Sequence, residues 1–569
     1  MNQTRWLRII GSLVVGVALL CGREAVFSDQ PIPPPQPLTT GPPDTCPCRV
    51  RHDNPATVGQ TGDTLVAGSI GDARTLIPIL ASDSSSQDIC GLVFNGLVKY
   101  APDLTLVGDL AEGWDVEEDG LVLVFHLRRN VRWHDGVRFS AQDVQFTYER
   151  LIDPHVPTPY GGDFERVQSL EVLDPYTVKV RYKEPFAPGL ASWGMWMMPK
   201  HLLEAADWQT TPLARHPIGT GPYRFKRWKT GELIELVVNP DYVEHRPFLD
   251  RYVYRIIPDQ ATMFLELSTQ QLDLTSLTPL QYRRQTDTPL FQQRYRRFRY
   301  PAFGYTYLGY NLKDPRFADR RVRQALNAAI NKEEIIEGVL LGLGRVSTGP
   351  FPPESWAYNE AVKPVPYDPA RAKALLAQAG WLDRDGDGWL DRDGRPFSFV
   401  LLTNQGNDQR QKAAEIIQRR LKELGIRVEI RVIEWSAFLS QFIEIRNFEA
   451  ILLGWGLSRD PDLFDLFHSS KTKPGEFNFV GYQNEEVDRL ILEGRRTFDQ
   501  AKRREIYRRI HELIYEDQPY TFLYVSDALP VAHARIRNVI ATPIGIGYNL
   551  IDWYVPTSEQ RYARWRLEP

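Results

Sequence analysis

The chain has 569 residues, with 68 lysines and arginines against 72 aspartates and glutamates, and a formal net charge of −4. This near-balance excludes a strongly basic protein of the kind that binds nucleic acid through its phosphates. The length is enough for several domain-sized units even without an N-terminal leader.

Residues 1–21 are typical of an export signal. Arg5 and Arg8 precede an apolar stretch, IIGSLVVGVALL, that is shorter than the ~20 residues a membrane-spanning helix needs. Cys21 follows directly and is the candidate for lipid attachment, although Leu20 stands where a lipidation signal has a small residue. Export is therefore predicted, as a protein lipid-anchored through Cys21 or as a soluble periplasmic protein. An uncleaved anchor helix is the third alternative.

Residues 22–60 are predicted to be a proline-rich linker. The stretch SDQPIPPPQPLTTGPPDTCPC should form an extended, semi-rigid spacer, because proline fixes φ and removes a hydrogen-bond donor. It contains Cys46 and Cys48, and the only later cysteine is Cys90. A bridge from Cys90 to either of them is open in an oxidising compartment. A metal site at Cys-Pro-Cys lacks further ligands nearby.

Residues 109–151 combine a buried strand, a turn and a capped helix. The run Leu121–Leu127 is apolar enough to be covered on both faces. His134-Asp135-Gly136 is a turn signal, because glycine readily adopts a positive φ. Ser140 and Asp143 have the spacing of a capping box, so a helix should begin there.

Residues 217–259 begin with a glycine-proline corner, PIGTGPYRF, followed by two strands. Gly219 and Gly221 are weak candidates for a phosphate loop, because neither the GxGxxG pattern nor a following lysine-serine pair is present. A turn is the better interpretation.

A βαβ unit is predicted after about residue 300. Residues 397–402 form a strand, 409–424 an amphipathic helix ended by Gly425, and 426–432 a second strand with alternating apolar residues. A strand, helix and strand within this length indicate a parallel pair with a right-handed crossover. The pattern is typical of an α/β protein.

Four segments resemble the family 5 extracytoplasmic solute-binding proteins, the peptide, oligopeptide and nickel receptors of ABC importers. They are residues 109–151, residues 217–259, RVRQALNAAINKEEI and YDPARAKALLAQAGW. The resemblance implies a two-lobed periplasmic binding protein of the Venus-flytrap type, with mixed sheets flanked by helices and closure about a hinge. The expected order is a signal peptide (1–21), a proline-rich linker (22–60), a first part of lobe I (61–92), its extra subdomain (93–200), a second part of lobe I (201–300), lobe II (301–518) and a return to lobe I (519–569).

The resemblance implies a monomer that binds peptides of the oligopeptide or dipeptide type in the cleft between the lobes. It would deliver them to a separate ABC permease and ATPase, without a cofactor and without catalysis. In the related proteins the peptide is held by backbone hydrogen bonds, as an added strand. An oligosaccharide, an opine or a metal chelate is the alternative cargo. A sensor that reports its ligand without transport is another alternative. A secreted hydrolase is the alternative from another class, although no GxSxG or HExxH motif is present.

The main candidate site is the segment GWGLSRDPDLFDLF after a predicted strand. In the peptide-binding members an aspartate three residues after the tryptophan pairs with the ligand's α-amino group. Ser458 holds that position after Trp455 and cannot supply the charge. Asp460 could supply it instead, the ligand could lack a free amino terminus, or Arg459 could face an anion.

Aromatic and amide side chains near the same cleft are further candidates. Trp455 is predicted to be a cavity wall, with core packing as the alternative. Trp435, Tyr310 and Asn311 are expected to line the cleft, as are Tyr305 and Tyr307, because aromatic rings suit contacts with peptide side chains or sugars.

An acidic loop, DRDGDGWLDRDG, is the candidate metal site. Asp383, Asp385, Asp387 and Asp391 match positions one, three, five and nine of a calcium loop. The twelfth position is Gly394 instead of a bidentate glutamate. A plain hairpin turn is favoured, with a weak calcium site as the alternative.

Overall fold

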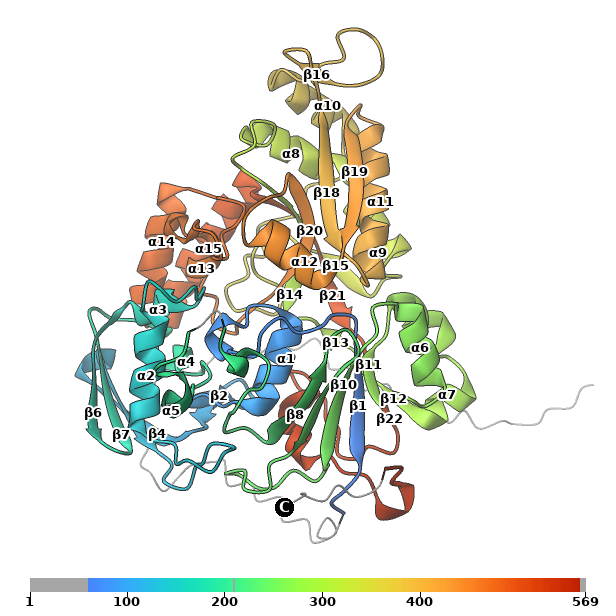
Figure 1. Cartoon of the computed structure of the whole chain (residues 1–569). Helices are drawn as coiled ribbons and strands as arrows, with labels where there is room; N and C mark the ends of the chain where they lie inside the picture. The colour runs from blue at the N-terminus through green and yellow to red at the C-terminus, as the bar shows by residue number, and fades with distance from the viewer. Residues whose placement is uncertain (1–59, 208–209, 563–569) are drawn as a thin grey trace, which may run out of the picture.

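The computed structural model describes residues 60–207 and 210–562 and has two lobes with mixed sheets and flanking helices (Figure 1). The first lobe is built on a seven-stranded sheet in the order β12-β22-β11-β1-β10-β9-β8. Its strands are β1 (Thr64–Ser69), β8 (Tyr223–Lys229), β9 (Leu233–Val238), β10 (Arg251–Ile256), β11 (Leu274–Ser276), β12 (Tyr295–Arg297) and β22 (Pro530–His533). Strand β1 runs parallel to both β10 and β11.

Helices α1 (Ser84–Val93), α6 (Gln260–Ser268) and α7 (Pro289–Arg294) belong to this lobe. The end of α1 explains the glycine-proline corner. Gly221 N–H donates to the Val93 carbonyl at 2.8 Å, and a Cβ on Gly219 would lie 1.8 Å from the same oxygen. The two glycines therefore allow the corner to pack directly on the helix end, as the turn interpretation expected.

The extra subdomain carries a four-stranded antiparallel sheet in the order β4-β5-β7-β6. Strand β5 (Val122–Leu127) is buried except at His126, in agreement with its apolar sequence. Helix α2 (Ala141–Leu151) begins with the predicted capping box of Ser140 and Asp143. The other elements here are β2 (Val98–Tyr100), β3 (Leu106–Gly108), β4 (Ala111–Glu117), α3 (Gly161–Phe164), β6 (Val167–Asp174), β7 (Thr177–Tyr182), α4 (Gly189–Ser192) and α5 (Lys200–Leu203).

The second lobe is built on a sheet in the order β13-β21-β14-β20-β18-β19, with β15 paired to β21. The predicted βαβ unit is confirmed, because β18 (Ser398–Asn404) and β19 (Arg427–Ile433) pair in parallel and α11 (Asp408–Lys422) connects them. The remaining strands are β13 (Tyr300–Pro301), β14 (Gly304–Tyr310), β15 (Gly344–Val346), β16 (Asp391–Arg392), β17 (Arg395–Pro396), β20 (Ala450–Gly456) and β21 (Tyr520–Ala528). The helices are α8 (Arg320–Ala329), α9 (Lys332–Gly338), α10 (Pro369–Gln378), α12 (Trp435–Phe438), α13 (Phe464–Phe467), α14 (Glu485–Arg496) and α15 (Gln500–Asp517).

The chain changes sheets twice. The first change lies between β12, which ends at Arg297 in the first sheet, and β13, which begins at Tyr300 in the second. The return lies later than the expected boundary at residue 518. Strand β21 still pairs with β14, and the first sheet resumes only with β22 at Pro530. The apolar run after Gln518 is buried in β21 and keeps the chain in the second lobe, because it fills the core there. The other expected boundaries stay predictions.

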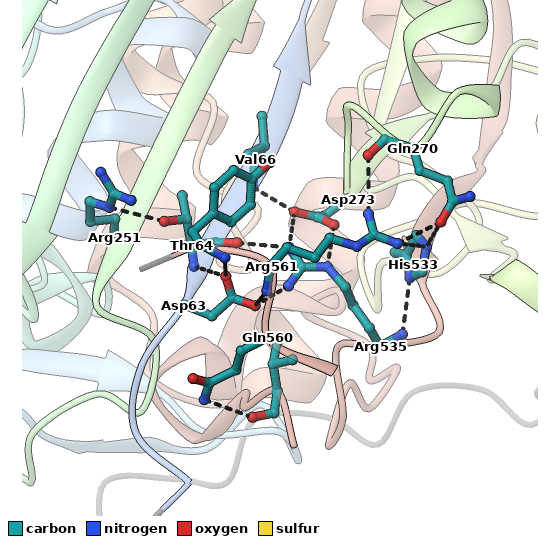
Figure 2. A network of polar contacts seen from close by, with 12 residues as sticks. Asp63, Thr64, Val66, Arg251, Gln270, Asp273, His533, Arg535, Gln560 and Arg561 are labelled. Carbon is teal, nitrogen blue, oxygen red and sulfur yellow. Dashed lines mark hydrogen bonds and ion pairs between the residues drawn. The ribbon is translucent and has the colours of Figure 1, made fainter. Parts of the chain in front are cut away.

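A buried polar network connects distant segments of the first lobe at the N-terminal end of β1 (Figure 2). Arg535 donates to both carboxylate oxygens of Asp273, at 2.8 and 2.6 Å, and to the Thr64 carbonyl at 2.8 Å. It also forms an ion pair with Asp63. The network therefore joins the first strand of the lobe to the segment that returns after residue 530.

His511 of α15 is fully buried and should make stability depend on pH. Its Nδ1 accepts from Asn359 N–H at 3.2 Å, and its Nε2 donates to the Thr348 carbonyl at 3.0 Å. Burial lowers the pKa of this imidazole from 6.5 to about 4. The folded state therefore keeps His511 neutral while the unfolded chain takes up a proton below pH 6.5, so this stabilisation is complete above that pH and lost as the pH falls towards 4.

We expect the wild type to lose about 2 kcal/mol of unfolding free energy between pH 7 and pH 5 that a His511→Gln variant does not lose. Denaturant unfolding at the two pH values measures the difference. His155→Gln, in an exposed loop, is the control and should follow the wild type. An identical pH response in wild type and His511→Gln would contradict the prediction.

Among the residues that the structure describes, no helix is both long and apolar enough to cross a membrane. The predicted signal segment and linker lie outside the described residues.

Candidate functional site

A cavity of about 1210 Å³ lies between the lobes. Its first-lobe side is formed by the loop after β1 and by α1, and its second-lobe side by the start of β14, the end of β20 and α12. The volume exceeds the roughly 300–1,000 Å³ of most small-molecule pockets. The cavity can therefore enclose a ligand of several residues.

Trp455, at the end of β20, lies in an aromatic cluster on the second-lobe side. Its ring stacks on Phe479 with centroids 5.5 Å apart and meets Phe477 edge-on at the same distance. The indole N–H donates to the Tyr520 hydroxyl at 3.4 Å. Trp455 lines the cavity and is half-buried, so a rigid apolar surface faces any ligand there.

Trp435 of the second lobe contacts residues of the first lobe. It begins α12 of the second lobe, and its indole N–H lies 3.4 Å from Oδ1 of Asp83 in the first lobe. A Cβ on Gly71, also in the first lobe, would lie 3.1 Å from the Trp435 ring. These contacts show that the structure has the lobes closed on one another.

The structure brings most of the predicted site residues to the cavity, namely Trp435, Tyr305, Trp455, Ser458, Arg459 and Asp460. It does not bring Tyr310 or Asn311 there. The Tyr310 hydroxyl is 2.7 Å from that of Thr521 in the core, and the Asn311 side chain donates to the Phe448 carbonyl. Only the beginning of β14 faces the cavity, and these two residues lie at its other end. Tyr307 is fully buried beneath Trp455.

Asp460 already has a cationic partner. Both of its carboxylate oxygens accept from Arg503 at 2.7 Å, a bidentate ion pair in which Arg503 is buried. Ser458 is exposed and uncharged. The loop after β20 therefore offers no unpaired carboxylate in the positions that the sequence suggested for an amino group.

Arg459 lies at the same rim of the cavity. Its guanidinium lies 4.0 Å from the centre of the Phe303 ring and donates to the Pro543 carbonyl. Partial burial lowers its pKa from the usual value, but arginine stays charged. It can face an anionic group of a ligand.

A second basic residue, Arg410 of α11, was not predicted from the sequence. It lines the cavity and donates to Asn404 at 2.8 Å. Two acidic residues of α1, Asp83 and Asp88, were also missed. The helix-capping position of Asp83 could be read from the sequence, but nothing there indicated that it faces the other lobe.

An interlobe charge cluster closes one side of the cavity. It consists of Asp163 from the first lobe and Asp462, Asp465, Lys471 and Arg495 from the second. Arg495 is 2% exposed, forms an ion pair with Asp163 and lies 3.1 Å from Asp462. Burial raises the pKa of Asp462 to about 6 and that of Asp465 to about 7, with Asp163 adding repulsion in both cases. The nearby cations oppose these shifts only in part.

The acidic loop lies beside β16 at the far end of the second lobe (Figure 1). Carboxylate oxygens of Asp383, Asp385 and Asp387 all lie within 4.8 Å of one another, and the three residues are exposed. Asp391 is not part of this group and pairs with Arg384. The Asp383 carboxylate accepts from two backbone N–H groups of its own turn. Calcium binding stays a prediction.

Cys90 is fully buried on α1. Its possible partners Cys46 and Cys48, and the lipidation candidate Cys21, lie outside the described residues. The disulfide and the lipid anchor therefore stay predictions.

Comparison with known proteins agrees with this architecture. Residues 105–476 match the bacterial extracellular solute-binding proteins, family 5 (Middle). The oligopeptide-binding protein AppA of Bacillus subtilis is 35% identical over 509 residues, which cover 87% of this chain and 92% of that protein. The chain therefore belongs to the family 5 bacterial extracellular solute-binding proteins.

Two solved structures are also similar. AppA from Bacillus subtilis in complex with a nonapeptide has a TM-score of 0.84 at 34% identity, covering 88% of this chain and 100% of that one. NikZ from Campylobacter jejuni in complex with Ni(L-His) has a TM-score of 0.78 at 29% identity, covering 86% and 99%. The two-lobed fold thus serves relatives with quite different ligands.

Proposed function

We propose that this solute-binding protein holds peptides in the cavity between its lobes and passes them, unreacted, to an ABC permease and its ATPase. The observation that carries the proposal is the size of the cavity between the lobes, about 1210 Å³, lined by aromatic rings and by charges of both signs. A peptide offers matching apolar side chains and two charged ends. The relative of 35% identity is named an oligopeptide-binding protein.

In this proposal the protein is an exported monomer, periplasmic or lipid-anchored through Cys21. Trp435, Trp455, Ser458, Arg459 and Asp460 contact the ligand or hold the residues that do. Ligand favours the closed form because it contacts both lobes only in that form.

Calorimetry with the full chain tests the cargo. Tripeptides to nonapeptides, a panel of oligosaccharides and nickel with L-histidine are titrated separately. Heat with peptides alone supports the proposal, and mass spectrometry of co-purified ligand identifies the natural sequence. Heat with sugars or the nickel complex alone would replace peptide by that cargo. Turnover of a bound peptide would favour a hydrolase instead.

Trp455→Ala should weaken peptide binding by about 5-fold to 150-fold, because it removes a rigid aromatic wall worth about 1–3 kcal/mol. Calorimetry measures the change in Kd. Trp389→Ala is the matched control, since Trp389 stacks on Arg427 beside the acidic loop and does not line the cavity. Equal affinities for the two variants would contradict a ligand-contacting role for Trp455.

A further inference from the structure

Two aspartates of α1 lie together in the first-lobe wall of the cavity. Asp83 is the N-cap of the helix, and its Oδ1 accepts from Ser86 N–H at 3.0 Å. The residue is 4% exposed, and its Oδ2 is buried without a hydrogen-bond partner among the described residues. A buried carboxylate oxygen with no partner is costly, because it has lost water without gaining a donor.

Asp88, five residues later in α1, also lines the cavity. Its side chain is exposed on the cavity side of the helix. Desolvation by the neighbouring protein raises the pKa of Asp88 to about 7, and the negative charge of Asp83 raises it further, against a smaller opposite effect of the Tyr254 hydroxyl. A nearby cation would reverse both unfavourable effects.

The other acidic residues that line the cavity have cations of their own. Asp460 pairs with Arg503, Asp163 and Asp462 with Arg495, Glu444 with Arg74, and Asp465 and Glu476 with Lys471. Within residues 60–207 and 210–562, neither Asp83 nor Asp88 forms an ion pair. Asp83 and Asp88 are therefore the carboxylates of the cavity wall that contact no cation in the described part of the chain.

Unpaired positive charge lies on the opposite lobe. Arg410 and Arg459 line the cavity and donate to Asn404 and to the Pro543 carbonyl, respectively, but to no described carboxylate. Within the described ranges, the cavity thus has two carboxylates without an ion pair on the first lobe and two guanidinium groups without one on the second. A ligand with charges at both ends would satisfy both sides.

We propose that Asp83 and Asp88 form a cation subsite that binds an ammonium or guanidinium group of the ligand. This inference rests on the proposed function and narrows it to peptides that place a positive group against α1. The group can be the free amino terminus or a lysine or arginine side chain. Such a cation would donate charge-assisted hydrogen bonds to both carboxylates, including the unpartnered Oδ2 of Asp83.

The test compares matched peptides at pH 8, above the pKa of about 7 of Asp88. Calorimetry measures a lysine-containing peptide, its norleucine counterpart, and each of them with an acetylated amino terminus. The wild type should lose at least 10-fold in affinity with one of these changes. Loss with norleucine identifies a side chain, and loss on acetylation identifies the amino terminus. Equal affinities across the set would overturn the proposal.

Two variants then test whether Asp83 and Asp88 cause the preference for the cationic peptide. Asp83→Asn keeps a good helix cap, and Asp88→Asn is nearly isosteric. Each should reduce the preference for the cationic peptide to within about 3-fold of unity, while Glu149→Gln on the exposed side of α2 retains it. Retained preference in both aspartate variants would overturn the proposal.

The melting temperature without peptide distinguishes a failure of the cation subsite from a failure of the proposed peptide-binding function. If no peptide binds the wild type, the proposed function fails, and the subsite is judged from melting of the ligand-free protein. Neutralising a carboxylate that has no cationic partner should leave the melting temperature equal or higher. Lower melting temperatures for both variants would show that the pair is held by internal partners and would overturn the subsite.

Discussion

Replacing Arg535 with methionine should destabilise the protein by about 3–5 kcal/mol, because the change leaves two buried carboxylates without their cation. Asp63 and Asp273 are 1% and 2% exposed, and Arg535 is 3% exposed. Burial already raises the pKa of Asp273, and Arg535 is the main group that lowers it. The loss should appear in denaturant unfolding of the full chain followed by circular dichroism.

Arg537→Met provides the matched control two residues along the chain. Arg537 pairs with Glu559 at the surface, where both side chains are more than a third exposed, and such a pair contributes at most about 1 kcal/mol. Adding Asp63→Asn and Asp273→Asn to Arg535→Met should recover part of the loss, because neutral amides no longer need a cation. Equal stability of the Arg535→Met and Arg537→Met variants would show that the network in Figure 2 is not the tie between the two segments.

Replacing Arg495 with methionine should weaken ligand binding by roughly 30-fold to 150-fold, which corresponds to about 2–3 kcal/mol. In the closed form Arg495 lies between Asp163 of the first lobe and Asp462 of the second. Without it, closure would bury two neighbouring carboxylates with no cation between them. Opening would separate Asp163 from Asp462 and relieve this repulsion, so we expect the variant to shift the equilibrium towards the open state.

Calorimetry with a bound peptide measures the affinity, and small-angle scattering of the ligand-free and loaded protein measures closure. The control is Arg496→Met, since the adjacent Arg496 forms an exposed interlobe pair with Glu184, and its loss should change the Kd less than 3-fold. The defect of Arg495→Met should shrink as the pH falls from 8 to 5. Burial raises the pKa of Asp462, so protonation favours the closed form. A Kd within 3-fold of the wild type would contradict this role.

The local elements of this protein could be predicted from the sequence. The capping box of Ser140 and Asp143, the buried strand β5 and the parallel β18-α11-β19 unit all form as expected. Each depends on near neighbours, since caps act within one turn and periodicity acts within one helix or strand. The family resemblance followed from such segments and supplied the two-lobed architecture.

The candidate site was predicted only in part, for a reason visible at Asp460. Its sequence position suggested a free carboxylate for a ligand, but Arg503, 43 residues later, neutralises it. Tyr310 was expected in the cleft because of its strand, yet the strand presents only its first residues to the cavity. Sequence patterns state what a side chain can do and do not state which partner it has.

The amino-acid sequence by itself determined the secondary-structure elements, the family and the kind of protein. Only the tertiary structure decided which charged side chains form ion pairs and which have no partner of opposite charge. Trp435 meets Asp83 across 352 residues of chain, and Arg74 meets Glu444 across 370. Such pairs exist only when both lobes are folded and closed, because burial and opposite charge, not chain proximity, select the partners.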